Sequence, residues 1–511
     1  MTKPIKPRKW LGLLALMPAI AMVFTDQAIL PVALPTIQNH LGATTTELWW
    51  CINSYLLVSA VLLLAGGKLG DRIGHRKVFI LGMIIFALSS ALCGLSFNIH
   101  WLIGSRALQG IGAALLTPAS APLIMSLFPQ NERGKALGIN VSVSSLFLVF
   151  APLIGGYFTE ELSWRWIFWV NLPLAVVGSL LVLLFVPPSP KGNQAFDPLG
   201  CFFFMIGASC LVILVMQGIT WGLLSLKSIA VFVLCLISTF LLFWREKQAK
   251  HPLIDLSLFR HPIYKAVNIS IFATQFVLMV SIYRAIFFQN ALDWSPLKSG
   301  TVLFVTALPV LFMSPIGGWL ADRSGPKIPI AIGFTSLIFS FFWLAFFIKS
   351  SLGILLLGLF AFAVGIPLIF TPSYSSAMGS IPPQKAGAAF GILATVRSLS
   401  ASLGVAMIGA FANHAQFYSF QTLIQNNPKT KTLDPSFLES FTTGIKQIRE
   451  SLSSEQLQIV LNSLKESQIK GFFLTHLSIG FVLIIAFAFV FVLYHRKASH
   501  HLPEAPAEGW D

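Results

Sequence analysis

Residues 67–77 read Gly-Lys-Leu-Gly-Asp-Arg-Ile-Gly-His-Arg-Lys, and residues 318–327 read Gly-Trp-Leu-Ala-Asp-Arg-Ser-Gly-Pro-Lys. Both stretches share the pattern G-x-L-x-D-R-x-G followed by basic residues, and both lie between two apolar segments. A motif that returns in the second part of a long apolar chain indicates two duplicated halves. Duplicated halves in a membrane protein are typical of secondary transporters.

The composition is that of a protein embedded in a lipid bilayer. The chain has 511 residues, of which 55% are hydrophobic and 10% charged, and its mean hydropathy is +0.78. A soluble domain carries about 25% charged residues. The apolar residues form blocks of about 20, which is the length of a helix that crosses about 30 Å of hydrocarbon.

The apolar blocks predict an all-α polytopic membrane protein with fourteen transmembrane helices. Two six-helix halves are expected in residues 1–186 and 263–511, and residues 187–262 supply a linker and an inserted helix pair. The predicted spans are 11–34, 47–67, 78–97, 101–126, 135–158, 164–186, 199–219, 226–244, 264–289, 299–320, 327–348, 351–374, 386–412 and 471–494.

The positions of Lys and Arg predict the orientation of the chain. They lie mainly in alternate loops, together with the N-terminal tail and Arg496-Lys497, and such a bias marks the cytoplasmic side. Both termini and both copies of the D-R-x-G motif are therefore expected in the cytoplasm. The net charge of +15 does not indicate a nucleic-acid partner, because no polar domain carries it.

One connection, residues 413–470, is long and polar, and the topology predicts that it lies outside the cytoplasm. Ser453 and Gln456 have the spacing of a helix capping box, and apolar residues follow at helical intervals. An amphipathic external helix is expected there. The alternative is a tether without a function of its own.

Four charged residues lie inside predicted spans, where charge is expensive and usually functional. They are Asp26, Arg106, Arg284 and Arg397. Arg106 and Arg284 are near span ends, so either could instead extend its charge to the membrane surface. Asp26 is too short for that, and it is expected to face a wet cavity or to pair with an arginine.

A carboxylate that exchanges a proton with water beside a movable arginine is sufficient for proton coupling. A nearby cation favours the ionised carboxylate and desolvation disfavours it, so alternating exposure can load and unload the proton. Asp26 and Arg106 are the predicted proton-coupling residues. Gln109, Arg284 and Arg397 are the further candidates for a substrate cavity.

The repeated loops have features that a simple basic loop does not need. Glycines allow close approach and a tight reversal, and the aspartate can lie at a helix end or pair with an arginine. We expect a cytoplasmic gate that is stable in one transport state, with the first copy as the stronger one. Its candidate residues are Gly67, Asp71, Arg72, Gly74, Arg76, Asp322 and Arg323.

No pattern of enzyme chemistry is present in the sequence. A Walker A motif, a nucleophile elbow and a zinc-protease motif are missing, and the five cysteines form no C-x-x-C pair. The sequence therefore predicts neither an enzyme nor a bound metal or cofactor, and a proton gradient is the expected energy source.

The motifs resemble those of the major facilitator superfamily, and the fourteen-span layout is similar to its drug:proton antiporter subfamily of EmrB/QacA type. The G-x-L-x-D-R-x-G loop resembles the family signature between helices 2 and 3. In this family the arginine of the helix-4 motif is implicated in proton coupling, and Arg106 occupies that position. The other matching stretches are Asp26 with Val32-Ala33-Leu34-Pro35, Arg106-Ala107-Leu108-Gln109-Gly110-Ile111-Gly112, Trp164-Arg165-Trp166-Ile167-Phe168 with Asn171 and Pro173, Pro252-Leu253-Ile254-Asp255-Leu256 with Phe259, and Ser295-Pro296 with Gly300.

Two departures from the subfamily concern direction and substrate. The helix-5 antiporter motif keeps Pro152, Gly155 and Gly156, but Phe147 and Ala151 replace two of its glycines, so the direction of transport is less firmly implied. In helix 1, Ala28 and Pro31 stand where Thr and Asn are common. Because cations exceed acids inside the spans, anionic, zwitterionic or neutral amphiphiles are expected to suit the cavity better than cations.

The resemblance implies proton-coupled export of amphipathic small molecules or drugs across the bacterial inner membrane by alternating access. A dedicated metabolite or siderophore transporter, in either direction, is the alternative. A membrane receptor on the same fold would need a large cytoplasmic signalling domain, and none is visible. The 413–470 loop would engage a periplasmic adaptor if the protein works as EmrB-like pumps do.

Overall fold

The computed structural model describes residues 9–190, 197–248, 256–381, 385–430 and 453–495. Within these ranges the regular structure is helical, and fourteen helices are long and apolar enough to cross a membrane. The predicted all-α membrane architecture is therefore confirmed. The predictions for the N-terminal tail, for Arg496-Lys497 and for Pro252–Asp255 concern residues outside the described ranges.

The first half contains the six spans that were predicted before residue 187. Span 5 continues into a short π-helical turn at Phe158–Leu162, and span 6 begins with a short helix. The main helices are α1 (Lys9–Leu41), α2 (Thr45–Ile73), α3 (His75–Gly94), α4 (Ile99–Leu127), α5 (Arg133–Tyr157), α6 (Trp166–Trp169) and α7 (Asn171–Phe185).

The inserted pair and the second half supply the other eight spans. Two of these spans are each divided into two helices, and the second division falls where Pro309 lacks the N–H that would continue the ladder of backbone hydrogen bonds. The helices are α8 (Pro198–Trp221), α9 (Leu226–Gln248), α10 (Pro262–Leu278) with α11 (Val280–Asn290), α12 (Pro296–Ala307) with α13 (Pro309–Ser324), α14 (Lys327–Phe347), α15 (Leu352–Gly379), α16 (Ala386–Asn426) and α19 (Ser454–His495).

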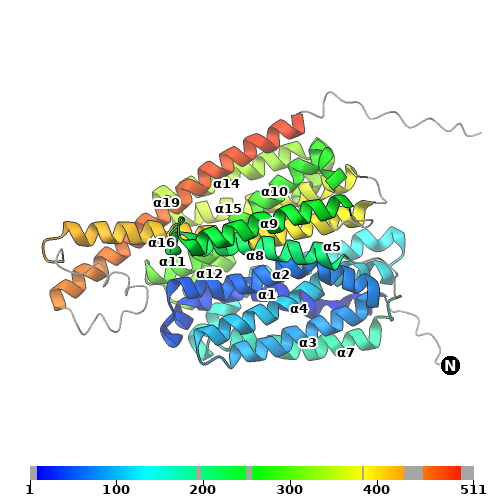
Figure 1. Ribbon diagram of the computed structural model, residues 1–511, viewed down its shortest axis with the longest axis horizontal. Helices are drawn as coiled ribbons and strands as arrows, with labels where there is room; N and C mark the ends of the chain where they lie inside the picture. Colours follow the sequence, from blue (N-terminus) through cyan, green and yellow to red (C-terminus); the bar gives the residue numbers. More distant parts are fainter. Residues whose placement is uncertain (1–8, 191–196, 249–255, 382–384, 431–452, 496–511) are drawn as a thin grey trace, which may run out of the picture.

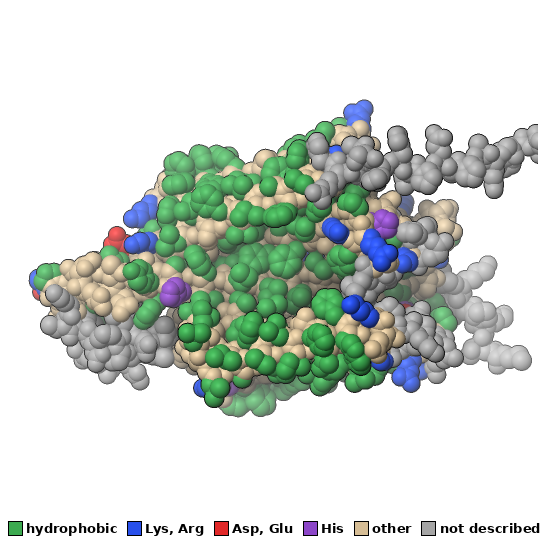
Figure 2. Space-filling model, turned by 45° about the horizontal axis from the view of Figure 1, so that its top comes forward, with side chains coloured by type: hydrophobic (Ala, Val, Ile, Leu, Met, Phe, Trp, Pro, Cys, Tyr) green, Lys and Arg blue, Asp and Glu red, His purple; other side chains and the backbone are tan. Residues whose placement is uncertain are grey.

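The bundle has two distinct ends. At the motif end, defined by the two D-R-x-G loops, α1 begins and α19 ends, and at the opposite, hairpin end α16 and α19 project beyond the other helices (Figure 1). Hydrophobic side chains cover the surface between the two ends, and Lys and Arg side chains gather mainly toward the motif end (Figure 2). This surface is the one that a bilayer requires.

The projecting hairpin corrects the expected form of residues 413–470. The capping box is confirmed, because the Gln456 backbone N–H donates to Ser453 Oγ at 3.3 Å and the Ser453 N–H donates to Gln456 Oε1 at 3.3 Å. The helix that it begins is not separate, however, since α19 continues without a break to His495, and α16 already extends to Asn426. Phe420, Ile424 and Val460 form a small apolar seam between the two extensions.

The inserted helix α8 packs against both halves, because it contacts α2 and α16. Asn53 of α2 marks this junction. Its Nδ2 group lies 2.9 Å from Met216 Sδ of α8, and its Oδ1 accepts from Ser402 Oγ of α16 at 2.7 Å. The inserted pair is therefore part of the interface between the halves.

Candidate functional site

The two charged residues predicted for proton coupling meet in the core of the first half. Arg106 Nη1 of α4 donates to Asp26 Oδ2 of α1 at 2.6 Å, and both side chains are 1% exposed. Helix α4 approaches α2 closely enough to hold Arg106 in place, because a Cβ at Gly110 would lie 2.6 Å from the Tyr55 carbonyl oxygen. The Arg106 guanidinium also lies over the Tyr55 ring, 4.3 Å from its centroid.

Gln109 connects the two charges to a wider polar network. Its Oε1 accepts from Arg106 Nη1 at 2.6 Å, and its Nε2 donates to Asp26 Oδ1 at 2.9 Å and to Ser90 Oγ at 2.8 Å. Asn171 Nδ2 of α7 donates to the same Ser90 hydroxyl at 3.3 Å. Gln109 therefore belongs to the charge pair itself, because its amide bonds both ionised groups.

The sequence did not identify Ser90 as a member of this network. A signal existed, since a polar side chain inside an apolar span needs a buried partner. Arg106 Nε also donates to the backbone carbonyl of Cys51 at 3.3 Å. This contact could not be predicted from the sequence, because every residue has a backbone carbonyl.

A small cavity of about 20 Å³ adjoins the charge pair. Asp26, Tyr55 and Arg106 line it from the first half, and Met279 and Ile282 line it from the second. This space holds about one water molecule. Asp26 therefore lines a space of about the size of one water molecule at the interface of the halves.

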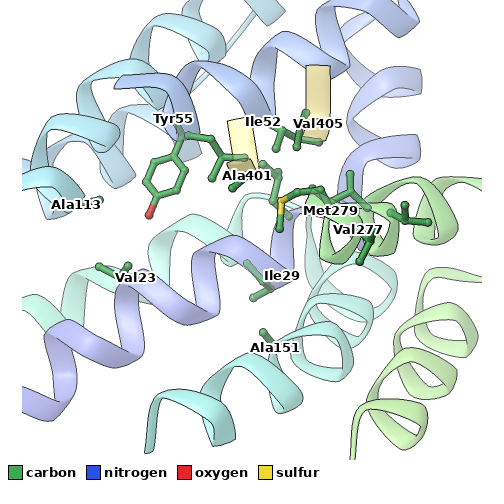
Figure 3. Close-up of a cluster of buried hydrophobic side chains, with 14 of the residues drawn as sticks. Val23, Ile29, Ile52, Tyr55, Ala113, Ala151, Val277, Met279, Ala401 and Val405 are labelled. Atoms are coloured by element: carbon green, nitrogen blue, oxygen red, sulfur yellow. The ribbon is translucent and has the colours of Figure 1, made fainter. Parts of the chain in front are cut away.

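Apolar packing closes the interface beside this cavity. Figure 3 shows Ile29 of α1 next to Met279, with Ile52 and Ala401 close by and Val23 further along α1. These side chains come from both halves and are buried. Val23 lies on the motif side of Asp26 along α1, and the packing around Ile29 separates the charge pair from the hairpin end.

Polar contacts hold the halves together toward the hairpin end. Helix α12 packs closely along α5 there, whereas its continuation α13 touches α5 much less. The bonds across the interface are Gln289 Nε2 to the Val32 carbonyl at 2.8 Å, the Leu297 N–H to Glu160 Oε2 at 2.8 Å, and Trp49 Nε1 to Asn413 Oδ1 at 3.3 Å.

The three retained residues of the helix-5 motif lie at this closed contact. A Cβ at Gly155 would lie 2.7 Å from the Ile29 carbonyl oxygen of α1. A Cβ at Gly156 would lie 2.7 Å from the Pro296 carbonyl oxygen of α12, and the carbonyl of Pro152 faces Gly300 of the same helix. The motif therefore permits close approach of α5 to α1 within its own half and to α12 of the other half, since small residues let helix backbones touch.

The first D-R-x-G loop makes its described contacts within its own half and with the linker. Gly74 has φ +99°, which confirms the tight reversal. Asp71 Oδ1 lies 3.2 Å from His75 Nε2, and Arg76 Nη2 donates to the Leu183 carbonyl at 2.7 Å. The Arg76 N–H donates to Ser189 Oγ of the linker at 3.1 Å.

The second copy of the motif is more open. Asp322 and Arg323 are exposed, and the Arg323 guanidinium lies 4.9 Å from the Trp319 ring centroid. The two copies thus differ in their contacts as well as in sequence.

In the first copy, the glycine that allows α2 to approach α4 closely is Gly66, which faces the Ala114 carbonyl. A Cβ at Gly67, the residue predicted for this role, would make only ordinary contact with Pro118.

Arg284 does not lie at the Asp26 cavity and does not extend to the membrane surface. It is 1% exposed and faces the core of the second half, where its Nε donates to His476 Nε2 of α19 at 3.2 Å. Its guanidinium carbon lies 4.3 Å from the Phe362 ring centroid and 5.3 Å from that of Phe341. The Nη2 atom is buried without a hydrogen-bond partner.

Arg397, by contrast, lies between the halves. Its Nε donates to Gln275 Oε1 of α10 at 3.1 Å. Its guanidinium carbon lies 5.9 Å from the ring centroid of Phe24 on α1 and 5.6 Å from that of Phe370 on α15. The structure therefore brings Asp26, Arg106 and Gln109 together, places Arg397 at the interface, and keeps Arg284 apart.

Two six-helix halves, the first with a buried charge pair in its core, define the class of protein, which is a multi-pass membrane transporter rather than an enzyme. In the part of the chain that the structure describes, no group of His, Cys, Asp and Glu side chains could hold a metal ion. The sequence model of the Major Facilitator Superfamily matches residues 16–405. The chain belongs to this superfamily, as its motifs indicated, and its described residues form the fourteen membrane-length helices that its apolar blocks predicted.

Two relatives illustrate the kinds of transporter to which this chain is similar. The chain is 32% identical to the riboflavin transporter RibZ of Clostridioides difficile over 420 residues, which cover 81% of this chain and 90% of RibZ. It is also 32% identical to the multidrug resistance protein Stp of Mycobacterium tuberculosis over 393 residues, which cover 76% of this chain and 73% of Stp.

A solved structure shows the same fold. It is a bacterial homolog of the human lysosomal transporter Spinster in an inward-facing and occupied conformation, with a TM-score of 0.67 and 17% identity. The match covers 98% of this chain and all of the other. At this identity the likeness concerns the fold alone.

Proposed function

We propose that this protein exports amphipathic small molecules in exchange for protons, by alternating access of its two halves. The observation that carries the proposal is the buried Asp26–Arg106 pair with Gln109 between its members. A buried ion pair is costly unless its geometry is good and its remaining hydrogen bonds are made. Selection for stability alone would favour apolar packing at such a place, so the pair indicates a role in transport.

In the proposed cycle a proton binds the Asp26 carboxylate. Protonation removes the negative charge that faces Arg106 and leaves the guanidinium buried without a counter-charge. Arg106 is then driven to another partner or to water, and the packing of α1 against α4 changes with it. The small cavity beside Asp26, lined by both halves, supplies the water through which the proton leaves when exposure alternates.

The structure fits the state of this cycle in which the interface is closed to the outside and the site is accessible from the cytoplasm. The halves are held together at the hairpin end, and the charge bias predicts that the motif end faces the cytoplasm. The interface would therefore be closed to the outside.

The relatives support export of small amphiphiles and also keep a second candidate open. Stp is named for multidrug resistance, which favours export of varied compounds. RibZ is named as a riboflavin transporter, which favours a dedicated metabolite carrier of the same fold. We place the protein in the bacterial inner membrane with both termini in the cytoplasm. An adaptor protein could bind the projecting hairpin.

The test is a flux assay with purified protein in liposomes that contain a pH-sensitive dye. Ethidium, riboflavin and 1-naphthylacetate serve as probes, each under an imposed proton gradient. We expect at least one of them to drive proton movement in the wild type and none to do so in Asp26→Asn. Proton-coupled transport that persists in Asp26→Asn contradicts the proposal.

A matched control is Asp197→Asn. Asp197 is also buried and also pairs with an arginine, Arg245, at 3.1 Å, but it lies at the start of α8. This variant is expected to keep coupled transport. Transport of riboflavin alone, without proton movement, would favour the dedicated carrier.

A further inference from the structure

Arg397 is a cation at the interface of the halves whose described partners are neutral. The residue lies three turns into α16, and its Nε donates to the neutral amide of Gln275. Phe24 and Phe370 present their rings to the guanidinium from opposite halves. Among the residues that the structure describes, no carboxylate forms an ion pair with Arg397, in contrast to Arg106, which pairs with Asp26.

Arg397 keeps part of its surface accessible and is not enclosed in the packed core. It lies within a run of half-buried positions on α16, residues 396–399. On α1, Phe24, Gln27 and Ala28 are half-buried in a helix whose other central positions are largely buried. Because the Arg397 guanidinium lies near the Phe24 ring, partly accessible side chains of the two halves meet at this place.

Arg397 also lies on the open side of the closed packing. Ala401, one helical turn further along α16, is buried in the cluster that separates the site from the hairpin end (Figure 3). Since α16 begins at the motif end, Arg397 is nearer to that end than Ala401 is. A solute that enters from the motif end would therefore meet Arg397 before it meets the apolar closure.

A guanidinium that lies within the membrane-spanning region without an acidic partner would be stabilised by an anion from outside the protein. Charge inside the hydrocarbon region is costly unless it is paired. The fork of N–H donors of arginine matches a carboxylate or a sulfonate, and flanking aromatic faces hold a flat apolar body. The two phenylalanines supply such faces at either side of Arg397.

We propose that Arg397 binds the anionic group of the transported substrate, with Phe24 and Phe370 against its apolar part, so that aromatic organic acids are the preferred class. The proposal rests on the proposed transport function but not on its proton coupling. The charge that the substrate brings would neutralise Arg397 in the loaded state. Because the contacts come from α1, α15 and α16, the bound anion would join both halves.

The test compares two ligands that differ only in charge, 1-naphthylacetate and its neutral amide, 1-naphthylacetamide. Binding to the detergent-purified full-length protein is measured at equilibrium with radiolabelled ligand. Loss of a charge-assisted hydrogen bond weakens binding by about 10- to 100-fold. We expect Arg397→Gln to lose about that much affinity for the acid and less than about threefold for the amide.

Two further variants make the result interpretable. Arg397→Lys keeps the charge and is expected to retain part of the preference for the acid, which a purely structural role would not predict. Arg165→Gln is the control, since Arg165 also lies over an aromatic ring, 4.4 Å from the centroid of Trp164, but is placed outside the interface. The melting temperature of each variant is compared with that of the wild type.

Two outcomes overturn the proposal. One is a wild type that binds the acid no more tightly than the amide, and the other is an Arg397→Gln variant that weakens both ligands equally. Because no proton gradient is present, the acid-to-amide ratio is independent of antiport. Failure of the proton-coupling test with a normal ratio would therefore refute the antiport and leave the anion site intact.

Discussion

The glycine at position 156 provides a direct test of the closed contact at the hairpin end. A Cβ built there lies 2.7 Å from the Pro296 carbonyl oxygen of the other half, which is 0.7 Å short of the 3.4 Å at which ordinary contact begins. It also lies 2.9 Å from Leu297 Cα, so backbone surrounds it and no flexible side chain can yield. Gly156→Ala should therefore push α5 and α12 apart.

The size of the effect follows from the cost of overpacking. One added methyl group in a tightly packed contact costs about 1–3 kcal/mol. The cost falls on the state in which the hairpin end is closed, and it is relieved when the halves separate there. A bias of about 1–3 kcal/mol changes the ratio of open to closed molecules by about 5- to 150-fold.

Electron–electron distance measurements between spin labels report this ratio. Labels at Glu161 and Lys298 lie on exposed positions of the two halves, next to the contact. We expect Gly156→Ala to increase the population with the longer distance. The control is Gly138→Ala on the same helix, where no heavy atom lies within 4 Å of the added Cβ. Equal distance distributions in the two variants would refute the reasoning.

Three further tests measure the energetics of the charged residues by thermal denaturation in detergent. Asp26→Asn and Arg106→Gln each leave a buried charge without its partner, so each should cost about 3–5 kcal/mol, and the double variant should cost about 0.5–3 kcal/mol less than their sum. Additive costs would contradict the pairing. Arg284→Met removes a buried guanidinium whose Nη2 has no hydrogen-bond partner, so the melting temperature should stay or rise, and a large fall would contradict this. Lys465→Gln breaks an exposed ion pair with Asp293 and should cost less than about 1 kcal/mol, a larger loss being the contrary result.

The fold could be predicted almost completely because the bilayer restricts the choices. Each crossing needs about 20 apolar residues, and its backbone groups must be bonded within the helix. The hydropathy pattern therefore identified the fourteen helices, and the repeated motif identified the two halves. The helix after Ser453 was predicted from its capping box, but its continuity with the last span was not. The extension of α16 over residues 413–426 was missed, because helix formation outside the bilayer requires no apolar residues.

The charged site could be predicted only in part. Asp26 and Arg106 were identified because ionisable residues are rare in membrane helices. The sequence predicts Gln109 only as a candidate cavity residue, and it could not show that the Gln109 amide hydrogen-bonds both Arg106 and Asp26. Arg284 and Arg397 could not be distinguished, although one faces the core of the second half and the other faces the interface.

The sequence by itself therefore determined the number of membrane helices, the duplication and the small set of charged residues inside the membrane. Each of these depends on the free energy of placing one residue type in hydrocarbon, which is a local property. Only the tertiary structure decided that Asp26 and Arg106, 80 residues apart, form an ion pair, and which arginine faces the other half. Those contacts depend on how each helix is rotated and tilted against its neighbours, and that is set by side-chain packing, such as the fit of Gly110 against Tyr55, and not by hydropathy.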